Sequence, residues 1–206
     1  TATGELTMAA QNPGNITGWL TDHDGRIRIA TTSDGVNTSI LYRDTEKDTF
    51  HTIMTTSFRE TFQPLFFTFD NKNLYAVANI GRDKAAVIEY NIALGKETKV
   101  IFEHPEVDVD GMNYSRLRKV LTEINFTSWK RERKFLDKQT EDLFRALGQK
   151  LPGYEVLING SSKNEDVHII RTLGDKTPGS YYIYEQKTSR LTKLADVNPA
   201  LSEKDL

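Results

Sequence analysis

One pattern recurs four times along the chain and constrains its fold more than any other feature. The corresponding positions Tyr42, Tyr90, Leu136 and Tyr184 follow one another at intervals of 48, 46 and 48 residues. At three of them an apolar, alternating segment (SILYRD, AVIEYN and YYIYEQ) precedes a polar turn and a second alternating segment. Short strands repeated at a period of about 40–50 residues are typical of β-propellers. The repeat therefore predicts an all-β propeller segment of about four four-stranded blades.

The blades are expected at residues 15–57, 62–103, 108–152 and 154–199. In the first two, Asp24-Gly25 and Asp70-Asn71 supply the turn that follows the inner strand. The segments 24–30 and 70–76 align at an offset of 46 residues, so inner and outer strands repeat together. This agreement supports the propeller over an irregular all-β fold.

The third repeat departs from the pattern after its first two strands, expected at 111–115 and 119–125. Beyond the basic segment TSWKRERKFLD, Asp137 or Thr140 is suited to begin a helix and Gly148 to end it. An apolar stripe and an i,i+4 ion pair lie between these limits, formed by Leu143, Phe144 and Leu147 and by Glu141 and Arg145. We expect a helix of about eleven residues that replaces or extends the outer strand.

The first residues resemble the end of the last repeat. Thr3, Leu6, Thr7 and Ala10 match Thr188, Leu191, Thr192 and Ala195 at a constant offset of 185 residues. Residues 3–10 are therefore predicted to be an orphan outermost strand whose blade lacks its inner strands in this sequence. We accordingly expect the chain to begin inside a blade and to be a fragment of a longer protein.

Charge and composition exclude several classes of function. A formal net charge of −2 gives no reason to expect nucleic acid or a membrane surface as a partner. There is no cysteine, no stretch of about 20 apolar residues and no charged-then-apolar leader. These features leave the compartment open.

Four phrases, in this order, carry a resemblance over nearly the whole chain: NPGNITGWLTDHDGR, RETFQPLFFTFDNKNLYAVANIGRDKAAVIEY, FEHPEVDVDG and SWKRERKFLDKQTE. The chain resembles the N-terminal propeller of bacterial serine peptidases of the prolyl oligopeptidase family, and most closely the acylaminoacyl-peptidase and dipeptidyl-peptidase-like members. The resemblance implies a propeller that caps a C-terminal α/β-hydrolase domain and restricts access to its active site.

The catalytic part of such a peptidase is not in this sequence. Hydrolases of this class carry their nucleophile in a Gly-x-Ser-x-Gly elbow. Gly160-Ser161-Ser162 lacks the second glycine, and Gly179-Ser180-Tyr181 reads as the start of a strand. We therefore expect the parent protein to be a serine peptidase and this chain alone to be inactive.

Two groups of residues are candidates for substrate contact. Arg59 and Glu60 precede an inner strand, in a loop of the kind that lines a propeller face; the alternative is an interblade salt bridge. In strand geometry Trp129, Arg131 and Arg133 share one face, where the arginines could bind a substrate carboxylate or carbonyl. For these three the alternative is an edge of the fold stabilised by ion pairs.

No cofactor or metal ion is expected. His23 lies between Asp22 and Asp24, but neighbouring strand residues point to opposite faces, so turn formation is the preferred interpretation. Asp108-Val109-Asp110-Gly111 resembles the start of a calcium loop, yet Lys119 stands where the loop requires a glutamate. The other histidines, His51, His104 and His168, are expected to be ordinary strand and loop residues.

The predicted function is that of a non-catalytic propeller domain which gates and orients short peptides for a C-terminal α/β-hydrolase domain. The alternative is a stand-alone protein-interaction propeller, such as a TolB-like scaffold. We also expect self-association, because an open series of blades exposes apolar faces that neighbouring blades would cover.

Overall fold

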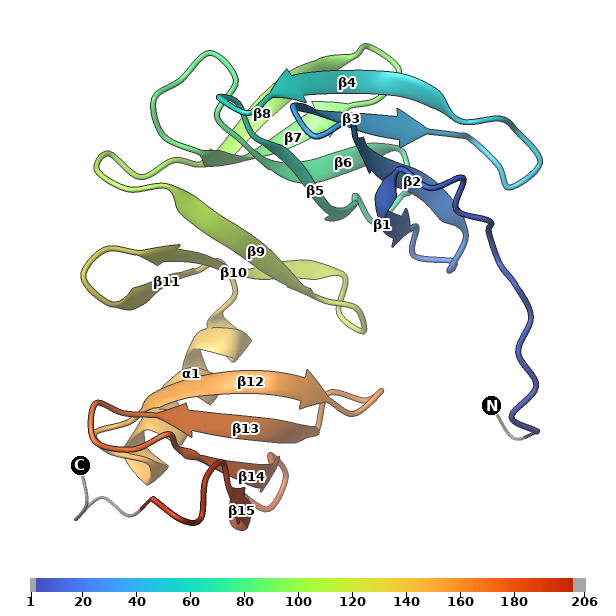
Figure 1. The fold of residues 1–206 in the computed structure, drawn as a ribbon. Coiled ribbons are helices and arrows are strands. Elements are labelled where there is room, and N and C mark those ends of the chain that lie inside the picture. Colours follow the sequence, from blue (N-terminus) through green and yellow to red (C-terminus); the bar gives the residue numbers. More distant parts are fainter. Residues whose placement is uncertain (1–2, 202–206) are drawn as a thin grey trace. The chain divides into compact units, whose positions relative to one another are not determined.

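The computed structural model describes residues 3–201, which form fifteen strands in four antiparallel sheets and one α-helix (Figure 1). Three sheets are four-stranded meanders in which consecutive strands are neighbours, and the remaining sheet has three strands. The predicted all-β organisation in propeller-like blades is confirmed. Within the described residues, no helix has the length and apolarity needed to cross a membrane.

The first two sheets are four-stranded meanders of similar length. The first contains β1 (Ile16–Thr21), β2 (Ile27–Ser33), β3 (Asn37–Tyr42) and β4 (His51–Ser57). The second contains β5 (Phe62–Phe67), β6 (Asn73–Ala78), β7 (Ala86–Asn91) and β8 (Lys96–Phe102).

The third sheet is the irregular one, as expected. It contains β9 (Val109–Ser115), β10 (Val120–Thr127) and β11 (Arg131–Phe135), in the order β11-β10-β9, and α1 (Lys138–Lys150) follows it. The helix thus takes the place of an outer strand in the chain. The fourth sheet contains β12 (Glu155–Ser161), β13 (Val167–Leu173), β14 (Ser180–Glu185) and β15 (Arg190–Asp196).

The inner hairpin of every sheet turns at the same place in the repeat. Gly25, Asn71, Lys119 and Glu165 all have positive φ, at 83°, 59°, 52° and 53°. They follow one another at 46, 48 and 46 residues, so the left-handed position keeps the period of the sequence. Only the first is a glycine, which is why glycine spacing alone does not reveal this series.

The described chain divides into two compact units. The first holds the residues up to Met112 together with Ile124–Lys134, and the second holds Asn113–Glu123 and the chain from Phe135 onward. In the first unit one core joins the faces of two sheets, and its buried members include Ile29, Ile40, Tyr42, Phe62, Phe67, Leu74, Ile88 and Tyr90. Packing of sheet upon sheet in this way is what a propeller requires of neighbouring blades.

A buried arginine also links the first two sheets. Arg28 lies 5.1 Å from the ring centroids of both Tyr42 and Phe67, and its Nη1 donates to the carbonyl oxygen of Asn71 at 2.9 Å. Burial, together with the hydrogen bond to Asp44, raises the pKa of Tyr42 to about 12. The guanidinium is thus enclosed by aromatic rings and acceptors, which offsets the cost of burying its charge.

In the second unit the helix covers one face of the fourth sheet. Leu147 and Leu151 form a core with Val156, Ile170 and Tyr184. The helix begins at the N-cap Asp137, as predicted, and its Glu141–Arg145 ion pair is present at 2.9 Å. An apolar helix face therefore buries the sheet face that a neighbouring blade would otherwise cover.

Three expectations are corrected. Residues 3–10 form no strand, because an outer strand is stable only when it pairs with a neighbour and none pairs with this segment. The helix does not stop at Gly148 but continues to Lys150, since Leu151 is the C-cap and its N–H donates to Leu147. The first hairpin closes by a bond from Asp22 N to Arg26 O, so its turn is longer than the two residues expected.

Candidate functional site

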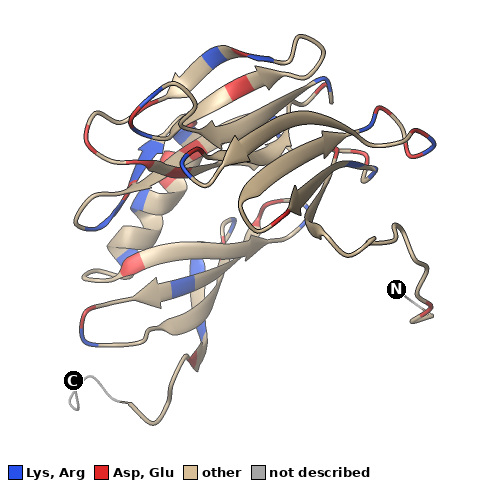
Figure 2. Ribbon diagram, turned by 45° about the horizontal axis from the view of Figure 1, so that its top comes forward, with Lys and Arg blue, Asp and Glu red and all other residues tan. Residues whose placement is uncertain are grey.

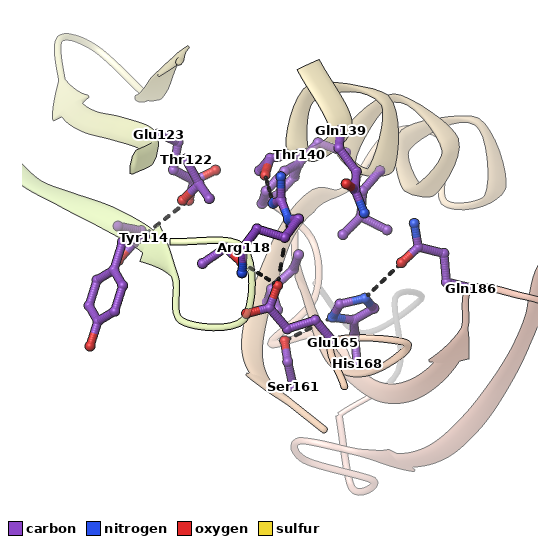
Figure 3. Close-up of a pocket in the computed structure, with 15 residues that line it drawn as sticks. Tyr114, Arg118, Thr122, Glu123, Gln139, Thr140, Ser161, Glu165, His168 and Gln186 are labelled. Carbon is purple, nitrogen blue, oxygen red and sulfur yellow. Dashed lines mark hydrogen bonds and ion pairs between the residues drawn. The ribbon is translucent and has the colours of Figure 1, made fainter. Parts of the chain in front are cut away.

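The second unit contains a cavity of about 230 Å³ that is lined mostly by polar residues (Figure 3). Four parts of the chain contribute to it: the β9–β10 hairpin, the first turns of α1, the β12–β13 hairpin and the residue that follows β14. Its polar lining residues are Asn113, Tyr114, Ser115, Arg118, Thr122, Glu123, Gln139, Thr140, Ser161, Glu165, His168 and Gln186. Its apolar lining residues are Leu143, Phe144 and Ile158.

Arg118 lies at the centre of the hydrogen bonds in this wall (Figure 3). Its Nη1 donates to Asp137 Oδ2 at 2.7 Å, its Nη2 donates to Thr140 Oγ1 at 3.1 Å, and its Nε lies 3.7 Å from Glu165 Oε2. Asp137 Oδ2 also accepts from the backbone N–H of Thr140 at 2.9 Å. One guanidinium therefore holds the N-terminus of α1 against two hairpins.

We predict that Asp137→Asn lowers the free energy of unfolding by about 1 kcal/mol at about pH 7 and by much less at about pH 3. Burial acts to raise the pKa of this carboxyl, but the hydrogen bonds from Arg118 and Thr140 outweigh it, and the pKa lies below its ordinary value. A depressed pKa contributes stability above the unfolded-state value, and that contribution disappears as pH falls through the folded-state value.

Urea unfolding at the two pH values measures this difference. Asp142→Asn is the control, because Asp142 lies on the same helix and its ion pairs are exposed. This change should alter the free energy of unfolding little at either pH. If Asp137→Asn lowers the free energy of unfolding equally at both pH values, the negative charge of Asp137 does not contribute to stability.

Glu165 occupies the left-handed turn position of the fourth sheet and bonds to the hairpin of the third. Its Oε2 accepts from Ser115 Oγ at 2.6 Å, and its Oε1 accepts from Leu117 N at 3.2 Å. The equivalent residue of the second sheet, Asn71, accepts with its Oδ1 from His23 N of the preceding hairpin at 3.0 Å. The same interblade hydrogen bond thus recurs, but only Glu165 places a carboxylate at a cavity.

Ser161, His168 and Gln186 form a chain of contacts along the wall. Ser161 Oγ lies 2.8 Å from His168 Nδ1, and His168 Nε2 lies 3.5 Å from Gln186 Oε1. With Nε2 protonated, Nδ1 accepts from the serine hydroxyl. A neutral amide stands where a catalytic triad has the carboxylate that stabilises the imidazolium. In this tautomer the contacts orient the Ser161 hydroxyl group toward the imidazole.

Glu123 brings a second carboxylate to the cavity. It lies in the middle of β10, only 6% of its surface is exposed, and its Oε1 accepts from Asn113 Nδ2 at 3.0 Å. With Glu165 it gives the lining two carboxylates against the single guanidinium of Arg118. Such a site favours a cationic group, and the three apolar lining residues favour a ligand with an apolar portion beside its charge.

The structure places the predicted contact residues elsewhere. Arg59 and Glu60 are exposed between β4 and β5, where the Arg59 guanidinium lies 5.5 Å from the Phe58 ring centroid. Glu60 lines a separate cavity of about 430 Å³ in the first unit, together with Trp19, Phe62 and several threonines. Their part in substrate binding stays a prediction.

Trp129, Arg131 and Arg133 belong to the β10–β11 hairpin of the first unit. Trp129 and Arg131 are exposed and Arg133 is partly buried, and their part in substrate binding stays a prediction. None of the five predicted contact residues lines the cavity of the second unit.

The sequence contained two signals for the residues that were missed. A glutamate in the apolar strand segment VLTEINFT is unusual, because a charged side chain is rarely buried without a partner. Glu165 lies one period from the turn residue Lys119 and two periods from Asn71. Neither signal shows that the two carboxylates face one cavity, because that depends on how two hairpins and a helix pack.

The histidine and aspartate clusters have structural roles where the structure describes them. Asp22 Oδ1 accepts from the backbone N–H groups of Asp24 and Arg26, both at 3.0 Å, which confirms turn formation. Asp108 accepts from Ala85 N at 2.7 Å, and β9 begins at the next residue. Within residues 3–201, no group of three or more potential ligands could hold a metal ion.

Comparison with known proteins gives one relative along the whole chain. The sequence aligns with dipeptidyl aminopeptidase BIII of Pseudoxanthomonas mexicana at 27% identity over 214 residues, which covers all of this chain and 30% of that protein. No family model matches the sequence.

Two solved structures have a similar fold. Puromycin hydrolase superposes on 92% of this chain with a TM-score of 0.54, and a prolyl endopeptidase superposes on 89% with a TM-score of 0.52, each at 11% identity. In both cases the match covers 30% of the other chain. The resemblance to the propeller region of prolyl oligopeptidase-type peptidases is thereby confirmed, and the chain spans less than a third of the length of each of these three proteins.

Proposed function

Starting from a chain that is homologous along its whole length to part of a dipeptidyl aminopeptidase, we propose that it is the non-catalytic propeller domain of a serine peptidase. In this proposal it gates and orients short peptides for a C-terminal α/β-hydrolase domain that supplies the nucleophile. The observation that carries the proposal is the match of the whole chain to a peptidase. The absence of a nucleophile elbow from this sequence is the reason for proposing a non-catalytic domain.

Gating follows from the rigidity of the scaffold. Each blade is a hydrogen-bonded meander, and in the first unit two blades share one buried core, so the scaffold does not open at low cost. A rigid propeller over an active site admits a short, extended peptide and excludes a folded protein by size.

Orientation is assigned to the cavity of the second unit. Its two carboxylates suit the ammonium group of a peptide amino terminus, and Leu143, Phe144 and Ile158 suit an apolar first side chain. An ammonium group that is partly removed from water binds well only where charged acceptors replace its hydration. The cavity would thus fix the peptide by its amino end, which agrees with the aminopeptidase activity in the relative's name.

We predict that Glu123→Gln in the full-length peptidase raises KM for a dipeptidyl amide with a free amino group by about 10- to 100-fold. The change keeps the shape of the side chain and the acceptor for Asn113, but removes the negative charge. Because the interaction is present in both bound substrate and transition state, kcat should change little. The measurement is steady-state hydrolysis of the chromogenic amide, with and without an acetyl group on its amino end.

Glu46→Gln, an exposed change in the β3–β4 turn, is the matched control and should leave KM unchanged. The acetylated substrate should bind poorly to both proteins and should not respond to Glu123→Gln. If Glu123→Gln has the same KM as the unmodified peptidase, the cavity does not bind the amino end, although the chain can still be a peptidase propeller.

A separate experiment tests the peptidase assignment itself. A fluorophosphonate probe should label the full-length protein on a serine that lies outside this chain, and the 206-residue chain alone should remain unlabelled and inactive. In the full-length protein, hydrolysis should fall steeply as the peptide substrate is lengthened toward a folded domain. A full-length protein without any reactive serine would instead support the alternative of an interaction scaffold.

A further inference from the structure

The tip of the β10–β11 hairpin presents a tryptophan to solvent. Trp129 is 84% exposed, and Lys130 Nζ lies 4.6 Å from its ring centroid. Two hydrogen bonds close the tip: Ser128 N donates to Lys130 O at 3.1 Å, and Ser128 Oγ donates to Glu132 Oε1 at 2.5 Å. An exposed tryptophan on a rigid hairpin is the type of side chain that anchors protein interfaces.

Two segments with net charges of opposite sign belong to this part of the first unit. Residues 130–134 contain four basic residues and one glutamate. Residues 103–110, which comprise the β8–β9 connection and the first two residues of β9 and are here called the acidic connection, contain four acidic residues and no lysine or arginine. The four carboxylates, Glu103, Glu106, Asp108 and Asp110, all belong to exposed residues. Elsewhere acidic and basic residues are largely interspersed along the loops (Figure 2).

Contacts within the first unit hold the two segments together. Thr127 Oγ1 donates to Asp110 Oδ2 at 2.8 Å, and the rings of His104 and Phe126 lie 4.7 Å apart. Lys134 Nζ lies 4.7 Å from the ring centroid of Phe102. The acidic connection is therefore packed against the base of the hairpin that carries the basic tip.

We propose that this surface is an interface between two copies of the chain. In a two-fold symmetric pair, the basic tip with Trp129 of one copy lies on the acidic connection of the other, and the reverse contact is identical. Every attraction is then made twice. A second copy of the chain offers an acidic segment to the basic tip and a basic segment to the acidic connection in the same complex.

Other partners fit this surface less well. A polyanion such as nucleic acid would be attracted by residues 130–134 but repelled by the carboxylates of 103–110 beside them. A purely basic partner would be attracted by the carboxylates of 103–110 but repelled by the basic residues of 130–134. Pairing of the open blade faces, which the sequence also predicts, would not involve Trp129 and is therefore distinguishable.

Sedimentation velocity of the 206-residue chain at low salt should show a dimer that dissociates as the salt concentration rises, because exposed charges are screened. Trp129→Ser and Lys130→Glu should each raise the dimer dissociation constant by at least about tenfold. Leu94→Ser, an exposed apolar residue in the β7–β8 turn of the same unit, is the matched control and should leave the constant unchanged.

A charge exchange makes the test specific. Lys130→Glu lowers the net charge of residues 130–134 from +3 to +1, and Glu103→Lys together with Glu106→Lys changes the net charge of residues 103–110 from −4 to 0. Each variant alone should dimerise through this surface at least about tenfold more weakly than the unmodified chain, and a mixture of the two should form a heterodimer with a lower dissociation constant than either variant shows alone. A monomer at all salt concentrations, a dimer unaffected by Trp129→Ser, or a mixture that remains monomeric would each overturn the proposal.

Discussion

Replacing Gly179 by alanine is expected to lower the free energy of unfolding of the second unit by more than about 4 kcal/mol. Gly179 has a φ of 89°, where a Cβ is unfavourable. An added Cβ would also collide with the carbonyl oxygen of Thr172 and lie 2.6 Å from its carbonyl carbon. That carbonyl has little room to move, because the backbone N–H of Ser180 donates to Thr172 Oγ1 at 3.0 Å and ties β14 to β13.

Gly148→Ala is the matched control for this prediction. Gly148 is an exposed helix residue, and no atom beyond its own helix turn would crowd an added Cβ, so alanine should stabilise the same unit by about 0.5–1 kcal/mol. Chemical unfolding followed by circular dichroism measures both changes. A loss below about 2 kcal/mol for Gly179→Ala would show that the β13–β14 corner can relax around a methyl group.

The second large effect is expected for Leu147→Ala, with a loss of about 2–5 kcal/mol. Leu147 has no exposed surface and packs with Val156, Ile170 and Tyr184 between α1 and the fourth sheet. Removing its side chain deletes apolar contacts and leaves a cavity, because helix and sheet cannot fully close the gap. The result would show that the helix stabilises the sheet in the way a neighbouring blade would.

Amide hydrogen exchange gives the location of this effect. Exchange should accelerate in α1 and β12–β15, while the amides of β5–β8 in the first unit keep their protection. Leu117→Ala, a change at a residue that is 58% exposed in the same unit, should cost less than about 0.5 kcal/mol. Similar losses for the two leucines would mean that the helix is peripheral to the stability of the sheet.

Much of the fold could be predicted because it depends on local patterns. The alternation of β1 and the turn at Gly25 are properties of a few consecutive residues, and the period repeats them. The N-cap Asp137 was also predictable, since capping needs one side chain and the backbone next to it. The strand assigned to residues 3–10 was wrong, because a local pattern does not supply a pairing partner.

The candidate site was harder to predict, because it depends on distant parts of the chain. Arg118, Asp137 and Glu165 come from a hairpin, a helix cap and a second hairpin, and none of them belongs to a recognisable motif. The contact residues predicted from sequence, such as Arg59 and Arg131, were chosen by charge and loop position alone. Charge on a loop is common on any protein surface, so it does not locate a cavity.

By itself the sequence determined the repeating blade, the helix in the third repeat and the absence of a nucleophile elbow, because periodicity, capping and motif spacing are read along the chain. Only the tertiary structure decided that Glu123, Glu165 and His168 line one cavity and that an acidic connection packs beside the Trp129 hairpin. The physical reason is that packing of separate elements brings these side chains together, and the energy of such contacts depends on distance in space rather than on separation in sequence.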